Sequence, residues 1–397
     1  MAEPLVSIVT PSFNHGRFIR STIESVLAQD YPNLEYIVMD GGSADETAAV
    51  VKDYASRLRF ISEPDRGQSH AINKGFRMAR GSILFWLNSD DLILPGAVRH
   101  AVDALQENPQ AGAVYGEGYL IDEQGKIKRR FPCTEPFNLW KLVYLSDYIL
   151  QQTAYFRRSA IDAAGDLRED LHFAMDWDLL IRIGKKYPLQ YIPDYMGCLR
   201  EHAAAKSSSG GMARAREIAR LLRGHTGMSY PPGAIVYGLE TCATMAAGWP
   251  APLNALLTRA SGYVIGRTIL RAQRWYGDGW VGHRFRYLLP PGAPRVLVME
   301  GWIPPWRGRK QELTLIAQER PVARREFFGG DFRWRVPLPG AALPLDLEIH
   351  ASRSFVPLFT ASGLDRRRLS YILRSIGVEH RRRATQAAAV GTASTAR

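Results

Sequence analysis

The chain has 397 residues, of which 46% are hydrophobic and 23% charged; this composition predicts two or three folded domains and excludes a disordered protein. The net charge of +12 admits nucleic acid, an anionic membrane or a phosphorylated substrate as partner, besides a generally basic surface. Three widely spaced cysteines match neither a disulfide framework nor a zinc site, so a reducing compartment is the simpler expectation.

The sequence shows no targeting or nucleic-acid-binding signature. Its first residues, MAEPLVSIVTPS, lack a basic segment followed by a long apolar one, and no uncharged apolar stretch of about 18 residues follows. We therefore expect a cytoplasmic protein without a transmembrane helix. No helix-turn-helix, zinc-finger or stacking-aromatic pattern is present, so nucleic acid is not an expected partner.

The first hundred residues alternate strand and helix patterns. The predicted strands are Leu5–Thr10, which Pro11 ends, Leu34–Met39, Leu58–Ser62 and Ile83–Leu87. The predicted helices are Arg17–Gln29, one from a Ser43/Glu46 capping box to about Tyr54, and one capped by Ser69 that runs to Arg80. Short connections between such units predict an α/β fold with a parallel sheet covered by helices, whose ligands bind beyond the carboxyl ends of the strands.

The composition changes along the rest of the chain. The run SSSGG at 207–211 indicates a domain boundary, and short alternating strands with Gly/Pro turns begin after Asp278. We predict a catalytic α/β domain over 1–210, a helical connecting segment over 211–275, a small β-sandwich over 276–380 and a disordered tail over 381–397.

Polar clusters follow the predicted strands, and the sharpest is Asn88-Ser89-Asp90-Asp91. Two adjacent carboxylates after a fully apolar strand repel one another unless a cation neutralises them, and Mg²⁺ or Mn²⁺ bridged to phosphates is a common solution. The alternative is that Asp91 caps a following helix. After the second strand, Asp40 can accept a hydrogen bond from a base or a ribose, and the glycine pair beside it lets a flat ring approach the backbone.

Five motifs occur in order over residues 4–210: VSIVTPSFNHGRFIRSTIESVLAQDYPNLEYIVMDGGSADET, EPDRGQSHAINKGF, LFWLNSDDLILPGA, FAMDWDLLIRIG and LREHAAAKS. Together they resemble a family 2 glycosyltransferase of the GT-A fold. Because neither GxGxxG nor a P-loop is present, dinucleotide redox chemistry and nucleoside triphosphate hydrolysis lose support.

The resemblance implies a set of site residues. Asp176 is implied as the catalytic base, although Met175 stands where the family has a Glu before it. The implied ligands of Mn²⁺ or Mg²⁺ are Asp91 and His202. The implied contacts to the nucleotide sugar are Pro11, Phe13, Asp40, Gly67, Asn73, Asp90 and Arg200.

The function that the resemblance implies is inverting transfer of a single sugar. The donor is a nucleotide-diphosphate sugar, with UDP favoured, and the acceptor is a hydroxyl of a glycan or lipid-linked sugar in bacterial cell-surface polysaccharide synthesis. Two alternatives stay open: a nucleotidyltransferase, which would release pyrophosphate, and a non-catalytic glycan-binding protein.

The C-terminal half leaves two further choices. Its tryptophans either stack on sugar rings or fill the core of the small sandwich; they are Trp275, Trp280, Trp302, Trp306 and Trp334. Four arginines either make peripheral contact with the inner membrane or form a solvated basic helix face; they are Arg259, Arg267, Arg271 and Arg274.

Overall fold

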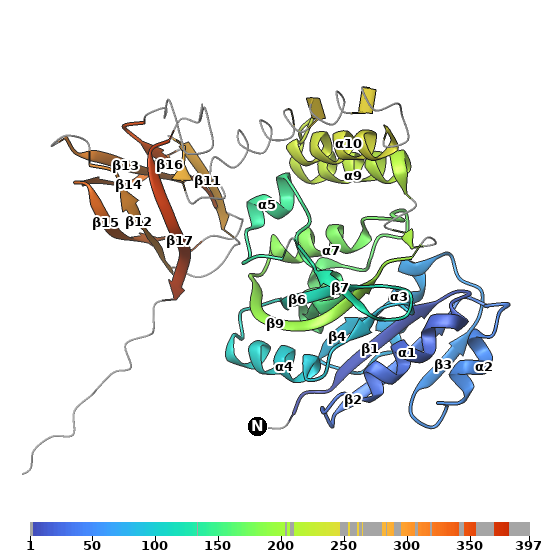
Figure 1. The fold of residues 1–397 in the computed structure, drawn as a ribbon. Helices are drawn as coiled ribbons and strands as arrows, with labels where there is room; N and C mark the ends of the chain where they lie inside the picture. The colour runs from blue at the N-terminus through green and yellow to red at the C-terminus, as the bar shows by residue number, and fades with distance from the viewer. Residues whose placement is uncertain are drawn as a thin grey trace, which may run out of the picture.

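The computed structural model combines an α/β part, a pair of helices and a β part in chain order (Figure 1). It describes residues 3–132, 134–202, 205–206, 210–246, 253–254, 260–261, 264, 280–282, 284–289, 295–305, 309–317, 320–340, 345–354 and 369–380. None of the helices within these ranges has the length and apolarity needed to cross a bilayer.

A nine-stranded sheet forms the centre of the α/β part, in the order β3-β2-β1-β4-β8-β6-β9-β5 with β7 beside β6. The first four strands pair in parallel, as expected, whereas β8 joins β4 and β6 in antiparallel fashion, so the sheet is mixed. The strands are β1 Val6–Ser12, β2 Leu34–Asp40, β3 Arg59–Ser62, β4 Ile83–Trp86, β5 Leu92–Ile93, β6 Ala113–Ile121, β7 Ile127–Arg130, β8 Tyr155–Arg157 and β9 Leu189–Arg200.

Helices cover both faces of this sheet, because successive strand residues point to opposite sides. Ile8 packs with α1 and α4 in one core, and its neighbour Val9 packs with α3, α5 and α7 in the other. The helices are α1 Gly16–Leu27, α2 Thr47–Lys52, α3 Gln68–Met78, α4 Ala97–Glu107, α5 Leu139–Tyr144, α6 Arg158–Ala164 and α7 Met175–Gly184, with a short 3₁₀ helix η1 at Gln151–Thr153.

Two predicted helix caps are wrong. The Ser43 hydroxyl donates to the Asp40 carboxylate, 2.5 Å away, and α2 starts only after Glu46. Likewise, α3 starts after Gly67, and the Ser69 hydroxyl lies 2.8 Å from the Met175 sulfur. In both cases another side chain takes the hydroxyl that the pattern assigned to the helix end: a neighbour in the β2 loop for Ser43 and a distant residue for Ser69. Strand β1 also runs through Pro11 to Ser12.

Close packing of α3 on β1 gives a matched pair of glycine predictions. A Cβ at Gly75 would lie 2.4 Å from Val9 Cγ1, whereas a Cβ at Gly224, also in a helix, has no described atom within 4 Å. We expect Gly75→Ala to destabilise the protein by about 2 kcal/mol through overpacking. Gly224→Ala should stabilise it by about 0.5 kcal/mol through helix propensity. Urea unfolding of both variants checks this, and equal signs would contradict it.

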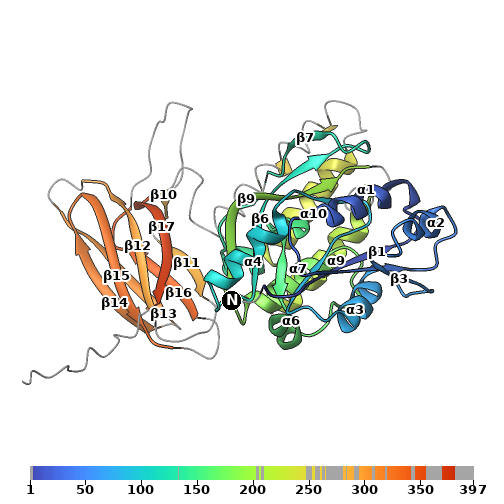
Figure 2. The same ribbon diagram turned by 90° about the horizontal axis from the view of Figure 1, so that it is seen from below.

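After the α/β part come two antiparallel helices, α9 Gly211–Thr226 and α10 Pro232–Met245, which lie within the predicted connecting segment. Figures 1 and 2 show them side by side on the α/β part. Most of 247–275, with Trp275 and the four arginines considered above, lies outside the described residues, as do Trp306 and the tail 381–397.

Two four-stranded sheets form the β part (Figure 2), in the orders β10-β17-β12-β15 and β11-β16-β13-β14. Both contribute to one apolar core, as a sandwich does, and Trp334 is buried in that core. The strands are β10 Trp280–Val281, β11 Arg284–Leu289, β12 Arg295–Ile303, β13 Gln311–Ala317, β14 Arg320–Phe327, β15 Gly330–Leu338, β16 Leu345–Ala351 and β17 Tyr371–His380.

Candidate active site

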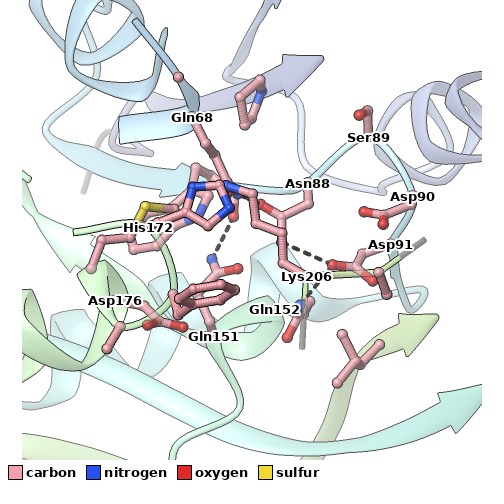
Figure 3. Close-up of a pocket in the computed structure, with 18 of the residues that line it drawn as sticks. Gln68, Asn88, Ser89, Asp90, Asp91, Gln151, Gln152, His172, Asp176 and Lys206 are labelled. Carbon is pink, nitrogen blue, oxygen red and sulfur yellow. Dashed lines mark hydrogen bonds between the residues drawn. The ribbon is translucent and has the colours of Figure 1, made fainter. Parts of the chain in front are cut away.

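A pocket of about 780 Å³ lies where the carboxyl ends of β1, β2 and β4 meet the start of α7 (Figure 3). Three residues implied by the sequence do not line it: Asp40, Asn73 and His202. The implied residues that do line it are Pro11, Phe13, Gly67, Asp90, Asp91, Asp176 and Arg200. Residues from all five motifs are therefore brought to one cavity.

The loops after β1 and β2 are fastened to each other at one end of the pocket. Asn14 has a positive φ of 54° and its side chain accepts from the Ala44 N–H, 2.9 Å away. Asp40 accepts hydrogen bonds from Ser43 and Ser62, so its carboxylate shapes the loop behind the pocket wall.

Gly41, next to Asp40, is the residue of this loop that lines the pocket. A Cβ there would lie 2.7 Å from the Asp65 carboxylate and 3.3 Å from the Phe13 ring, so a side chain would displace both. Phe13 is 59% exposed, which leaves its ring available to a planar ligand.

The Asn73 side chain has a structural role: it is hydrogen-bonded to the backbone of the segment before α7. Its amide nitrogen donates to the Leu167 carbonyl and its amide oxygen accepts from the Leu167 N–H, both at 2.9 Å. Since this side chain is buried and engaged twice, it joins α3 to the segment before α7 and has no contact with the pocket.

Asp91 is buried beneath the floor of the pocket. One carboxylate oxygen accepts from the Arg200 backbone N–H, and the other accepts from Asn88 and Gln152 at 3.0 and 2.6 Å. Burial and, second, the charge of Asp90 raise the pKa of Asp91 to about 8. The site therefore holds a carboxylate whose ionised form needs a nearby positive charge.

Asp90 and His202 form a second polar pair beside Asp91. His202 Nε2 lies 2.9 Å from Asp90 Oδ2, and Nδ1 is buried with no partner among the residues that the structure describes. A search over those same residues gives no cluster of three or more His, Cys, Asp or Glu side chains that could hold a metal alone. A cation with one or two protein ligands, completed by substrate phosphates, fits this donor set.

The Arg200 guanidinium is engaged in hydrogen bonds with other groups of the protein. Its Nε donates to the Asp90 carbonyl, Nη1 to the carbonyls of Asp122 and Glu123, and Nη2 to the Ser21 hydroxyl. Four of its five N–H groups are thus engaged. The geometry makes Arg200 a clamp on the Asp90–Asp91 loop, with little capacity left for a diphosphate.

Lys206 supplies a cation that the sequence reasoning missed. Its ammonium donates to Gln68, and Gln68 donates to Asn88, which in turn donates to Asp91, so one chain of hydrogen bonds crosses the pocket (Figure 3). Burial lowers the pKa of Lys206, partly offset by the charge of Glu217. Its place in the LREHAAAKS motif was the available signal.

Asp176 lies across the pocket from Asp90 and Asp91, at the start of α7 (Figure 3). Burial raises the pKa of Asp176, and a hydrogen bond from the Trp177 N–H offsets part of that rise. Asp147 lines the same pocket, and burial together with the charge of Asp176 raises its pKa as well. A carboxyl group with a raised pKa in a cleft is suited to proton transfer.

Asp178 differs from Asp176 although both lie in the first turn of α7. Asp178 is buried against Arg182 and His225, 2.7 and 2.9 Å away, and lies outside the pocket. Burial alone would raise the pKa of Asp178, but the hydrogen bond from His225 and the charge of Arg182 hold it below its ordinary value.

We therefore expect Asp178→Asn to lower the free energy of unfolding by about 3 kcal/mol, because it leaves the half-buried Arg182 guanidinium without its counter-charge and weakens the hydrogen bond with His225. The pKa of Asp178 is lower in the folded protein than in the unfolded one. The stabilisation is therefore present above the unfolded pKa and is lost as pH falls through the folded pKa. Urea unfolding at neutral and acid pH checks both points. A variant as stable as wild type at neutral pH would contradict them.

Comparison with known proteins identifies relatives of this chain. A family model described as glycosyl transferase family 2 matches residues 7–163. An uncharacterized glycosyltransferase of Mycobacterium tuberculosis is 33% identical over 185 residues, covering 46% of this chain and 69% of the relative. Chondroitin synthase of Escherichia coli is 30% identical over 192 residues, covering 48% of this chain and 28% of the synthase.

Among solved structures, a mannosyltransferase from Pyrobaculum calidifontis in complex with GDP-Man and Mn²⁺ is similar, with 20% identity and a TM-score of 0.47. The match covers 68% of this chain and 86% of that one. Several curated relatives are much longer, since the chain spans only 18% to 33% of four of them.

These matches establish the class of protein as a glycosyltransferase. The chain belongs to glycosyltransferase family 2, and its α/β part, a mixed sheet covered by helices, is followed by additional β-sheets.

Proposed function

We propose that this glycosyltransferase transfers a single sugar, with inversion, from a nucleotide-diphosphate sugar to a hydroxyl of a glycan or lipid-linked acceptor. The observation that carries the proposal is the pocket itself, which has the acidic pair Asp90–Asp91 on one side and the carboxyl group of Asp176, near Asp147, on the other. That arrangement separates a leaving-group end from an acceptor end within one cavity.

The nucleotide would lie at the end formed by the β1 and β2 loops. Phe13 offers an exposed ring for the base, Pro11 and Gly67 line the floor, and Asp65 presents a carboxylate beside Gly41. Asp40 would act through the loop that it holds. Uridine is the favoured base on the family resemblance alone.

The diphosphate would lie near Lys206, Asp90 and Asp91. Asp91 and His202, with Asp90, are the candidate ligands of Mn²⁺ or Mg²⁺, which when bound supplies positive charge to stabilise the leaving diphosphate. Lys206 adds a second positive charge through direct contact with the phosphates. Arg200 holds the loop that carries both aspartates.

Asp176 would take the proton from the acceptor hydroxyl as that oxygen attacks the anomeric carbon. Its raised pKa makes it a better base than an ordinary carboxylate once ionised. Attack from the side of the pocket opposite the leaving group inverts the anomeric centre. The acceptor would then contact the wall formed by Phe173, Trp177 and Tyr237.

The cellular role that we propose is bacterial cell-surface polysaccharide synthesis on the cytoplasmic side of the inner membrane. The two described cysteines, Cys198 and Cys242, are free thiols, which fits a reducing compartment. The similarity to a chondroitin synthase favours a glycan acceptor.

Product analysis tests the proposal. The protein, a nucleotide sugar of known α configuration and a mixture of lipid-linked acceptors should give one β-linked sugar per acceptor, with nucleoside diphosphate as by-product. An α-linked product would contradict inversion, and release of pyrophosphate would favour a nucleotidyltransferase.

A further inference from the structure

One face of helix α9 lines the active-site pocket, and the opposite face is exposed. Arg214 and Ile218 line the active-site pocket, whereas Arg216, Arg220 and Arg223 are exposed. At 3.6 residues per turn, these three arginines fall within an arc of about 60° on the side away from the pocket. Among the described residues, no carboxylate forms an ion pair with any of the three; Arg223 Nε donates to the Ser229 carbonyl, 3.0 Å away, and the charge of Arg220 acts on Asp170.

Two exposed apolar side chains, Met228 and Tyr230, follow the end of this basic stripe. Of the ten large hydrophobic residues that are exposed in the described part of the chain, five lie between residues 228 and 264. Tyr230, in the turn from α9 to α10, is 76% exposed, and Met228 beside it is 43% exposed. Met245, at the end of α10, is 60% exposed, and Glu240 is the one charged residue between 228 and 246.

We propose that the outer face of α9, with the α9–α10 turn, docks on a lipid bilayer that carries anionic headgroups. This surface is defined by Arg216, Arg220, Arg223, Met228 and Tyr230. Guanidinium groups pair with lipid phosphates, while an amphipathic tyrosine and a flexible methionine enter the headgroup boundary. The charge and the apolar exposure lie next to each other, as this mode of binding requires.

The position of the surface connects it to the acceptor end of the pocket. Arg214 of α9 and Tyr237 of α10 are pocket residues, so the same helix pair lies between the proposed membrane face and Asp176. One helix diameter, about 10 Å, separates the two faces of α9. An acceptor anchored in the bilayer could reach around this pair. This surface would present a lipid-linked acceptor to the pocket, and that part of the inference rests on the proposed function.

Vesicle co-sedimentation of the full chain tests the surface without any donor or acceptor. Wild type should bind phosphatidylcholine vesicles that contain phosphatidylglycerol, and added salt should weaken the binding. The triple variant Arg216→Gln/Arg220→Gln/Arg223→Gln should lower the partition coefficient about 100-fold. Met228→Ser/Tyr230→Ser should weaken the binding that remains at high salt.

A matched control is Arg320→Gln/Arg324→Gln/Arg325→Gln on the exposed strand β14, which removes the same charge elsewhere. It should bind vesicles like wild type, and both triple variants should keep their melting temperature and their nucleoside diphosphate release in solution. Equal losses in both triples, or no vesicle binding by wild type, would overturn the proposal. Binding of an anionic polysaccharide in place of vesicles would also overturn it. If release fails while vesicle binding persists, the proposed function falls and the docking surface stands.

Discussion

Asp176→Asn should reduce kcat by a factor of about 10² to 10⁴, the usual contribution of a general base. The KM for the donor should stay near the wild-type value, because Asp176 lies across the pocket from the acidic pair. Steady-state nucleoside diphosphate release measures both quantities.

The same substitution should not destabilise the fold. Burial raises the pKa of Asp176, so its ionisation costs folding free energy as pH rises through the folded pKa, and a neutral amide avoids that cost. The melting temperature at neutral pH should therefore equal or exceed that of wild type. Asp178→Asn in the same helix turn is the matched control, with the opposite pattern of lost stability and retained activity per folded molecule. If the Asp176→Asn enzyme kept wild-type activity, Asp176 would not be the general base.

Asp90→Asn should reduce kcat by a factor of about 10² to 10³, as expected when a candidate ligand of the cation that stabilises the leaving-group charge is lost. The isosteric amide can keep the contact with His202 Nε2, so the effect isolates the charge. His202→Gln should have an effect of the same order. Both variants should need more Mn²⁺ for half-maximal rate.

Thermal unfolding tests the same prediction without an activity assay. Mn²⁺ together with a nucleoside diphosphate should raise the melting temperature of wild type by ligand binding, and each variant should lose most of that increase. Asn73→Ala serves as the comparison: it removes a structural clamp, so the basal melting temperature should fall while the Mn²⁺ effect remains. An undiminished Mn²⁺ effect in both pocket variants would place the cation elsewhere.

The strand pattern and the order of motifs were enough to predict the α/β fold and most of the pocket. The apolar run at Ile83–Trp86 predicted a buried strand, and the acidic pair after it lies in the pocket as expected. The helix-cap pattern failed where another side chain competes for the hydroxyl, whether it is near in sequence or distant. Ser43 and Ser69 read as helix caps, yet one bonds to Asp40 and the other contacts Met175.

Roles within the site were harder to predict than positions. Arg200 and Asn73 occupy motif positions, but only the fold shows that nearby backbone groups engage their side chains. Asp147 and Lys206 reach the pocket from segments far from Asp90 in sequence. Lys206 lies in one of the five motifs, but nothing in the local sequence of Asp147 distinguishes it from a surface residue. The sandwich was predictable from alternation, because strands such as β12 and β15 bury every second side chain.

The most direct test of the account is nucleoside diphosphate release from a panel of UDP-, GDP- and dTDP-sugars, run with Mn²⁺ and with EDTA in the presence of lipid-linked acceptors. Wild type should release the nucleoside diphosphate of one donor class, and only with Mn²⁺ or Mg²⁺. Asp176→Asn should release it at a small fraction of that rate. Release that persists in EDTA, or that is unchanged in Asp176→Asn, would contradict the account.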